Sequence, residues 1–294
     1  MNSLLNQIRL NPEEISQVED AHEHLVSVLH SKAGSGRLPT PKDVLLIGSF
    51  ARDTKITPLD DVDMFYVIGK ATSHDGHWHS IIDCDFSFGQ NFLDADQNIS
   101  SIKILELIKK EIDATYPTSE IRRSGEVVNL FLSSYGVGFD ITPVFEITNG
   151  EYYLMPEGKG SHKWKRSNPL IDHAHISELD ERHSYLLKDI ILLAKYWFDK
   201  KRIKSLRSYH LESIAYHLFD YAPQAALTHE DGLSYLLRNL NHNNRLYSCP
   251  DPTGLSEPLS SGLTTEDIVN IQNEANVALG HLAQGNQKFI EYVN

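Results

Sequence analysis

Residues 45–68 constrain the fold of this chain more than any other stretch. They read as an apolar strand, a turn at Gly48 and Ser49 that opens a short helix, and a second apolar strand with Asp61 and Asp63 near its start. Side chains two positions apart on a strand share a face, so Asp61 and Asp63 point the same way. Neighbouring carboxylates repel each other unless a cation lies between them, and Mg²⁺ binds a few carboxylates together with substrate phosphates.

The turn itself is suited to an anion. Gly48 lets the backbone approach a ligand closely. The start of the helix offers N–H groups to a phosphate, and Ser49 adds a hydroxyl. The stretch therefore predicts a phosphate-binding turn beside a metal-binding pair of acids.

A further acid, Asp140, interrupts an apolar run in a predicted strand over 138–147. One interpretation is an exposed position on an edge strand, which Pro143 favours because proline cannot donate to a sheet ladder. The other is a third carboxylate that completes the metal site.

The order of elements predicts an α+β fold with two lobes, because strands concentrate in the first half of the chain and helices in the second. We expect a core lobe with a mixed sheet over residues 1–165, a helical lobe over 166–294, and an active-site cleft between them. The N-terminal helix, which begins at Asn11 and Pro12, is expected to pack across both lobes. The predicted helices cover 12–31, 99–114, 177–199, 206–221, 232–240 and 264–293, and the predicted strands cover 43–47, 62–68, 126–133, 138–147 and 151–155.

Charge bears on the class of partner. The net charge is −13, which argues against a long nucleic acid partner because lysine and arginine supply most of that affinity. The window 159–207 nevertheless holds twelve basic and six acidic residues, a net +6. It is either a solvated helix face or a local pocket for a triphosphate.

Cysteine usage and hydropathy bear on location. Two cysteines, Cys84 and Cys249, form no disulfide framework and suit a reducing cytoplasm. No apolar run is long enough to span a membrane, so we expect no membrane partner. Residues 1–10 lack the basic start and apolar core of a secretory signal.

A cluster of metal-binding residue types lies at 74–84. His74, His77, His79 and Cys84 suggest a zinc site, but the spacing lacks the paired ligands of structural zinc sites. A solvated loop is the favoured interpretation.

Gly48-Ser49, eleven intervening residues, Asp61-Val62-Asp63 and a later strand acid together resemble nucleotidyltransferases of the DNA-polymerase-β type. The run from Gly48 to Asp63 is similar to that of the bacterial CD-NTases, relatives of animal cyclic GMP-AMP synthase and oligoadenylate synthase. Further segments fit the same family, and the resemblance covers roughly residues 10–290. These segments are Lys163–Pro169, Lys195–Trp197, Leu206–Glu212 and Asp251–Gly254.

The resemblance implies a bilobal polymerase-β-like fold and a two-metal reaction. Asp61, Asp63 and Asp140 would be catalytic and hold two Mg²⁺ ions, with Mn²⁺ as an alternative. Asp140 would act as a base or bridge the metals. The triphosphate would bind Gly48 and Ser49, together with Lys195 and Ser208 from the helical lobe.

The activity implied is the joining of ATP and/or GTP into a cyclic di- or trinucleotide with release of pyrophosphate. In that family the product is a second messenger of bacterial anti-phage defence and activates a separate effector protein. Two alternatives stay open from the residues. One is nucleotidyl transfer to RNA, a protein or a small molecule, and the other is a catalytically inactive nucleotide-binding scaffold.

Overall fold

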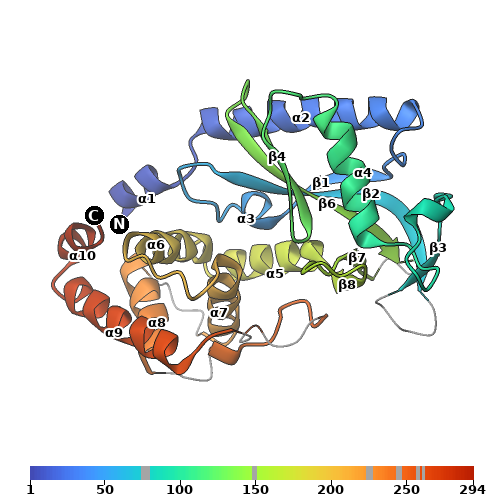
Figure 1. The fold of residues 1–294 in the computed structure, drawn as a ribbon. Helices are drawn as coiled ribbons and strands as arrows, with labels where there is room; N and C mark the ends of the chain where they lie inside the picture. Colours follow the sequence, from blue (N-terminus) through green and yellow to red (C-terminus); the bar gives the residue numbers. More distant parts are fainter. Residues whose placement is uncertain (74–79, 148–150, 223–227, 243–246, 256–258, 260–261) are drawn as a thin grey trace. The chain divides into compact units, whose positions relative to one another are not determined.

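The computed structural model describes residues 1–73, 80–147, 151–222, 228–242, 247–255, 259 and 262–294. The chain divides into two compact units (Figure 1). One, the helical unit, comprises Met1–Leu10, Arg52–Pro58 and Leu170–Asn294. The other, the sheet unit, comprises Asn11–Ala51 and Leu59–Pro169. The units differ from the predicted lobes mainly in that Met1–Leu10 and Arg52–Pro58 group with the later helices.

The sheet unit is built on one mixed sheet of eight described strands. They are β1 (Asp43–Leu46), β2 (Asp61–Ser73), β3 (Ile81–Cys84), β4 (Ile121–Ser124), β5 (Val127–Leu132), β6 (Val137–Ile147), β7 (Tyr153–Pro156) and β8 (Trp164–Ser167). Five follow the order β1-β2-β6-β5-β4, while β3 pairs with β2, β7 with β6, and β8 with β7. The β2–β6 pair is parallel and the others are antiparallel. The predicted strands are confirmed, and β3, β4 and β8 are additional.

Strand β6 lies inside the sheet, between β2 and β5, so the interpretation of Asp140 as an edge position is wrong. Pro143 is tolerated in this strand for a local reason. Pairing with β5 ends at Ile141, and pairing with β7 begins at Phe145. Position 143 therefore has no partner strand on that side, where a missing N–H costs no ladder hydrogen bond.

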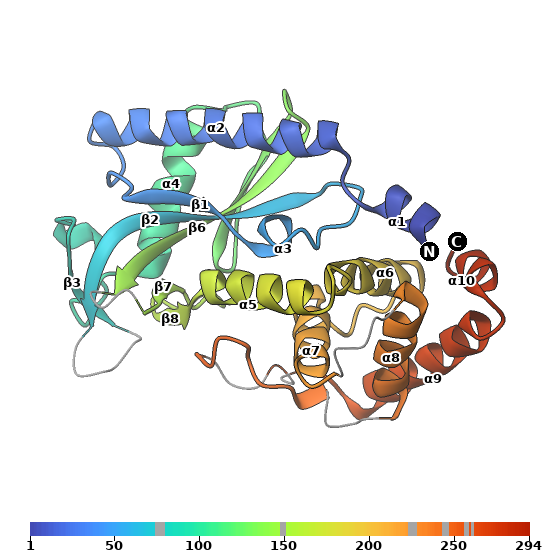
Figure 2. The same ribbon diagram turned by 180° about the vertical axis from the view of Figure 1, so that it is seen from behind.

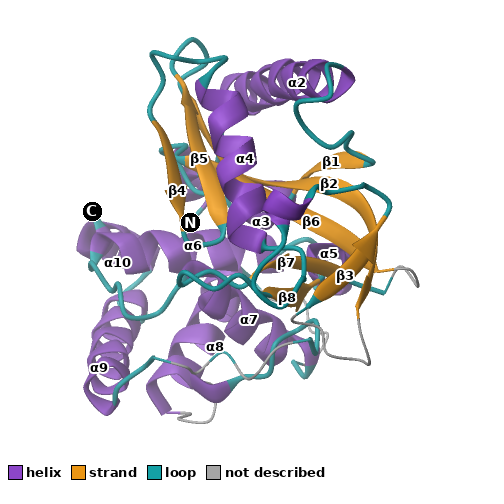
Figure 3. Cartoon of the chain, turned by 45° about the vertical axis from the view of Figure 1, so that its right-hand side comes forward, coloured by secondary structure: helices purple, strands orange, loops and turns teal. Residues whose placement is uncertain are grey.

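Helices α2 (Pro12–Gly34) and α4 (Ser101–Asp113) pack on the sheet, α2 on β6 and α4 on β4, β5 and β6 (Figure 3). As predicted, α2 begins at a capping residue, Asn11, which forms a capping box with Glu14. The His22 ring of α2 lies 6.4 Å from the Phe139 ring of β6, centroid to centroid. Successive strand residues point to opposite faces, so Asp140 points away from α2.

The helical unit is organised around α6 (Leu187–Lys200), which contacts α1 (Asn2–Ile8), α7 (Ser208–Asp220), α8 (His229–His242) and α10 (Asn286–Val293) (Figure 2). Most residues of α6 are buried. The other helices of this unit are α5 (Pro169–Arg182) and α9 (Thr265–Leu282). Leucine, isoleucine and aromatic side chains from all of these helices form one buried apolar cluster. Within the described ranges, no helix combines the length and hydropathy needed to cross a bilayer.

Two predicted helices are each two helices in the structure. The predicted helix 177–199 is interrupted between α5 and α6, where Ser184 and Tyr185 both have positive φ angles of 58° and 61°. The predicted final helix ends at Leu282 and begins again after Gly285, whose φ is 112°. A right-handed helix cannot continue through left-handed backbone, and only glycine takes such angles without strain.

Candidate functional site

The pairing of β2 with β6 places the predicted acids. In this parallel register Asp63 lies directly opposite Asp140, and Asp61 lies opposite Gly138. Asp61 and Asp63 share a face with Phe65. Phe65 belongs to an apolar cluster that also contains Val144 of β6. The acids and this cluster therefore lie on the same face of β2 and β6. Asp61 is exposed, and Asp63 and Asp140 are half-buried, so all three are accessible to a ligand.

Two glycines make room for these acids. Gly48, with a φ of 70°, begins the short helix α3 (Gly48–Ala51), and a Cβ there would lie 2.1 Å from Oδ2 of Asp63. A Cβ on Gly138 would lie 2.1 Å from Oδ1 of Asp61. The backbone N–H of Ile47 donates to the carbonyl of Asp63 at 2.9 Å, which holds the turn beside β2. Gly48 is therefore needed for the Asp63 side chain as well as for the turn.

Asp140 has a partner that the sequence interpretation did not include. Asn129 of β5 lies directly opposite Asp140 on the antiparallel side, and its side-chain amide donates to Oδ1 of Asp140. The signal was present, since Asn129 is the one polar residue in the otherwise apolar run Val127–Leu132. An amide donor fixes a carboxylate without adding charge, so Asn129 orients Asp140.

The donor set fits Mg²⁺, because three hard carboxylates stand on neighbouring strands and on one face. Their side chains do not converge in this structure. The Asp63 carboxylate lies against Gly48, and that of Asp61 lies against Gly138. Among the described residues, no group of three or more Asp, Glu, His or Cys side chains is arranged to hold a metal ion.

The two predicted helical-lobe residues occupy different environments. Lys195, in α6, is only 6% exposed, and its amine donates to the carbonyl of Thr54 at 2.7 Å. It also forms an ion pair of 2.5 Å with Glu212 of α7. Ser208 is the first residue of α7 and is exposed.

The basic window 159–207 is partly neutralised. Lys165 pairs with Glu126, Arg182 with Glu178 and Asp220, Lys188 with Asp53, and Lys195 with Glu212. The window also extends over the end of the sheet unit and the start of the helical unit.

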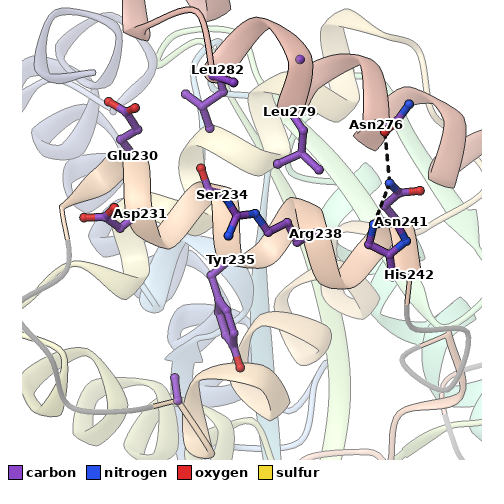
Figure 4. A pocket seen from close by; sticks show the side chains of 13 residues that line it. Glu230, Asp231, Ser234, Tyr235, Arg238, Asn241, His242, Asn276, Leu279 and Leu282 are labelled. Atoms are coloured by element: carbon purple, nitrogen blue, oxygen red, sulfur yellow. Dashed lines mark hydrogen bonds between the residues drawn. The ribbon is translucent and has the colours of Figure 1, made fainter.

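A hollow of about 970 Å³ lies between α8 and α9 (Figure 4). Its lining includes Glu230 and Arg238 of α8 and Asn276 and Leu279 of α9, and none of the predicted site residues.

The candidate zinc loop falls mostly outside the described residues, since His74, His77 and His79 lie there. Cys84 is described, and its thiol donates to the carbonyl of Phe86 at 3.0 Å.

Comparison with known proteins adds a family and a fold. A model of the "Second Messenger Oligonucleotide or Dinucleotide Synthetase domain" matches residues 1–182. A protein of Bacillus cereus (strain VD146), named as a probable cyclic nucleotide synthase, is 32% identical over 193 residues. That match covers 62% of this chain and 57% of the relative, so the chain spans little more than half of the relative's length.

Solved structures share the fold over nearly the whole chain. Escherichia coli MS115-1 CdnC, in a complex with HORMA-deltaN, has a TM-score of 0.71 at 15% identity and covers 98% of this chain and 92% of its own. Apo DncV of Vibrio cholerae has a TM-score of 0.69 at 13% identity, with 99% and 91% covered. A STING-associated CdnE c-di-GMP synthase from Capnocytophaga granulosa has a TM-score of 0.66 at 14% identity, with 95% and 85% covered.

Proposed function

The chain belongs to the family of second messenger oligonucleotide or dinucleotide synthetases, and we propose on that premise that it is a Mg²⁺-dependent cyclic nucleotide synthase. The predicted CD-NTase family and its polymerase-β-like α+β fold are confirmed by the family match and the structural neighbours. The observation that carries the activity is the position of Asp63 opposite Asp140, with Asp61 on the same face and Gly48 beside it.

The proposed roles follow from the chemistry of these groups. Asp61, Asp63 and Asp140 would hold Mg²⁺, which supplies charge neutralisation on the triphosphate and a lowered pKa of the attacking hydroxyl. Asp140, oriented by Asn129, would accept the proton of that hydroxyl. Gly48 and Ser49 would bind phosphate oxygens through backbone N–H groups and the serine hydroxyl. Positioning and charge neutralisation account for most of the catalysis in such a transfer.

The proposed substrates are ATP and/or GTP, and the proposed product is a cyclic di- or trinucleotide formed with release of pyrophosphate. Two structural neighbours support the substrate class, because E. coli CdnC is known with ATP and V. cholerae DncV with GTP. In a cyclising reaction the linear product must turn round and present its own triphosphate to the same acids.

The proposed setting is second-messenger signalling in the cytoplasm, where nucleoside triphosphates are available. The family description names second messengers, which supports this role. The product would then activate a separate effector protein in anti-phage defence.

The test is incubation of the purified protein with the four ribonucleoside triphosphates, labelled in turn, and Mg²⁺. A phosphatase-resistant product, identified by mass spectrometry as a cyclic oligonucleotide, supports the proposal. A labelled macromolecule would instead indicate transfer to another acceptor, and absence of turnover would indicate a binding scaffold.

Two variants make the test specific for the site. Asp63→Asn should abolish product formation. Asp43→Asn is the matched control, because Asp43 is an exposed aspartate on the adjacent strand β1, and its carboxylate accepts a hydrogen bond from the backbone N–H of Val44. Equal turnover by the two variants would reject the site.

A further inference from the structure

A buried polar cluster lies within the helical unit, and it includes none of the three acids. It contains Glu212, Arg52, Thr54, Lys195 and Tyr216, and we refer to it as the Glu212 cluster. Glu212 is 1% exposed, Arg52 5% and Lys195 6%. Two cations therefore share one carboxylate where water has little access.

Each oxygen of Glu212 is used. Oε1 accepts the ion pair from Lys195 at 2.5 Å. Oε2 accepts from Nε of Arg52 at 2.9 Å, from the hydroxyl of Tyr216 at 2.7 Å and from that of Thr54 at 3.1 Å. Lys195 closes the cluster by donating to the carbonyl of Thr54 at 2.7 Å.

The charges of the cluster depend on one another. Burial alone would raise the pKa of the Glu212 carboxyl, but Lys195 and Arg52 outweigh burial and hold that pKa below its ordinary value. Burial likewise opposes the charge of Arg52, and Glu212 more than compensates by raising the pKa of the guanidinium. A buried ion cluster is a weak source of stability, because desolvation offsets most of the attraction. Its structural consequence is that it fixes the backbone that carries Arg52 and Thr54.

That backbone has a particular place in the chain. The segment Arg52–Pro58 connects the turn Gly48–Ala51 to Asp61, so it joins the proposed phosphate-binding residues to the proposed metal ligands. Two further contacts hold it in the helical unit. Lys188 pairs with Asp53 at 2.9 Å, and the N–H of Thr57 donates to the carbonyl of Ile8 at 2.9 Å.

We propose that Glu212 is a positioning residue for nucleotidyl transfer, which holds Arg52 and Lys195 and thereby sets the segment between the phosphate-binding turn and the metal-binding acids. The inference rests on the proposed function for its catalytic consequence. It concerns a residue that contacts neither phosphate nor metal in that proposal. Lys195 has two roles in this inference. It would bind the triphosphate, and its amine is already held by Glu212 when no triphosphate is bound.

The first test needs no nucleotide. Hydrogen exchange measured by mass spectrometry on the intact chain should show faster exchange of residues 52–58 in Glu212→Gln than in the wild type. The control is Tyr247→Phe, which removes another buried hydrogen bond of the helical unit, 2.7 Å long, from Tyr247 to the carbonyl of Leu240. It should leave exchange at 52–58 unchanged. Unchanged exchange in Glu212→Gln would overturn the inference.

The second test is kinetic. Glu212→Gln should lower kcat by at least about tenfold, because small displacements of reacting groups are costly, while the KM for nucleotide changes less. Tyr216→Phe keeps the charge of Glu212 and removes one hydrogen bond, so it should retain most of the kcat. Tyr216→Phe also keeps the inference testable if Glu212→Gln folds poorly. In Tyr216→Phe, hydrogen exchange at residues 52–58 should rise only slightly, because Glu212 keeps its charge. Activity that falls only with the folded fraction, as expected for Tyr247→Phe, would reduce Glu212 to a structural residue.

The two proposals fail in different ways. A wild-type protein without turnover would reject the proposed function, and the exchange experiment would then decide alone whether Glu212 sets the segment. A wild-type protein with turnover and a Glu212→Gln variant with normal kcat would reject the positioning role and leave the proposed function standing.

Discussion

Asp63 of β2 lies directly opposite Asp140 of β6, across the parallel pair inside the sheet. The two acids are 77 positions apart in the sequence, and strand register alone brings them together. The same register places Asp61 opposite Gly138. Asp63 therefore faces a second carboxylate, and Asp61 faces a glycine that leaves room for its own carboxylate.

Gly138→Ala tests this register directly. The added Cβ would lie 2.1 Å from Oδ1 of Asp61, so the Asp61 side chain must move. We expect nucleotide turnover to fall by about a hundredfold, the scale seen when a reacting group is misplaced. Gly34→Ala is the matched control, since its Cβ would meet nothing within 4 Å and it also lacks left-handed backbone. Equal turnover of the two variants would show that the position of Asp61 is unimportant.

Asp61→Asn or Asp63→Asn should abolish synthesis without unfolding the protein. Removing one acid from a repelling pair leaves stability unchanged or raises it when no metal is present. Mg²⁺ together with nucleotide should raise the melting temperature of the wild type and not that of the variants. Thermal unfolding with and without Mg²⁺ measures this, and near-normal turnover in either variant would contradict the site.

Lys195→Ala should weaken nucleotide binding and also destabilise the fold. The variant leaves the buried carboxylate of Glu212 with one cation fewer, and breaking a buried pair costs about 3 kcal/mol. Lys188→Ala is the comparison, because its partner Asp53 is 76% exposed and such pairs contribute about 0.5 kcal/mol. Urea unfolding gives both values, and nucleotide titration gives the affinity. Unchanged affinity in Lys195→Ala would remove Lys195 from the binding site.

The sequence predicted the local parts of this site and missed the parts set by tertiary packing. Gly48, Asp61 and Asp63 lie within one short stretch, so turn chemistry and strand alternation were enough to relate them. The contact between Asn129 and Asp140 depends on the register between β5 and β6, which the sequence alone does not fix. Pro143 led to the wrong expectation of an edge strand. It is tolerated inside the sheet because it lies in the gap between the pairing of β6 with β5 and the pairing of β6 with β7, and this gap is known only once the sheet is seen.

The Glu212 cluster shows the same limit in the helical unit. Glu212 sits in a helix that begins with an exposed serine, and nothing in its local pattern distinguishes it from a solvated acid. Its burial follows from the packing of α6 against α7 and from the inclusion of Arg52 in the helical unit. The predicted helix 177–199 failed for a different reason, because the residues with positive φ angles that interrupt it, Ser184 and Tyr185, are not glycines.

Long nucleic acid should not stimulate product formation. The net charge is −13, and several basic residues of the window 159–207, among them Lys165 and Arg182, already form ion pairs with acidic residues. Binding to a duplex depends on many lysine and arginine contacts with phosphates. Rates measured with and without duplex DNA or RNA at low salt should agree within error. Stimulation that disappears as salt is raised would contradict this expectation.

His210 should make the protein lose stability in mild acid. Burial lowers the pKa of His210 from 6.5 to about 4, so its neutral form is favoured in the folded state. The unfolded chain takes up the proton first as pH falls, and the resulting stability, present above pH 6.5, is lost between pH 6.5 and about 4. The loss is at most about 3 kcal/mol. Asp172 acts in the opposite direction, because burial raises its pKa to about 6 and its contribution is lost as pH rises through that value. The measurement is therefore a difference, namely the unfolding free energy of the wild type minus that of His210→Gln. This difference should shrink as pH falls through the window, because glutamine does not titrate, and a difference independent of pH would show that His210 is not buried in its neutral form.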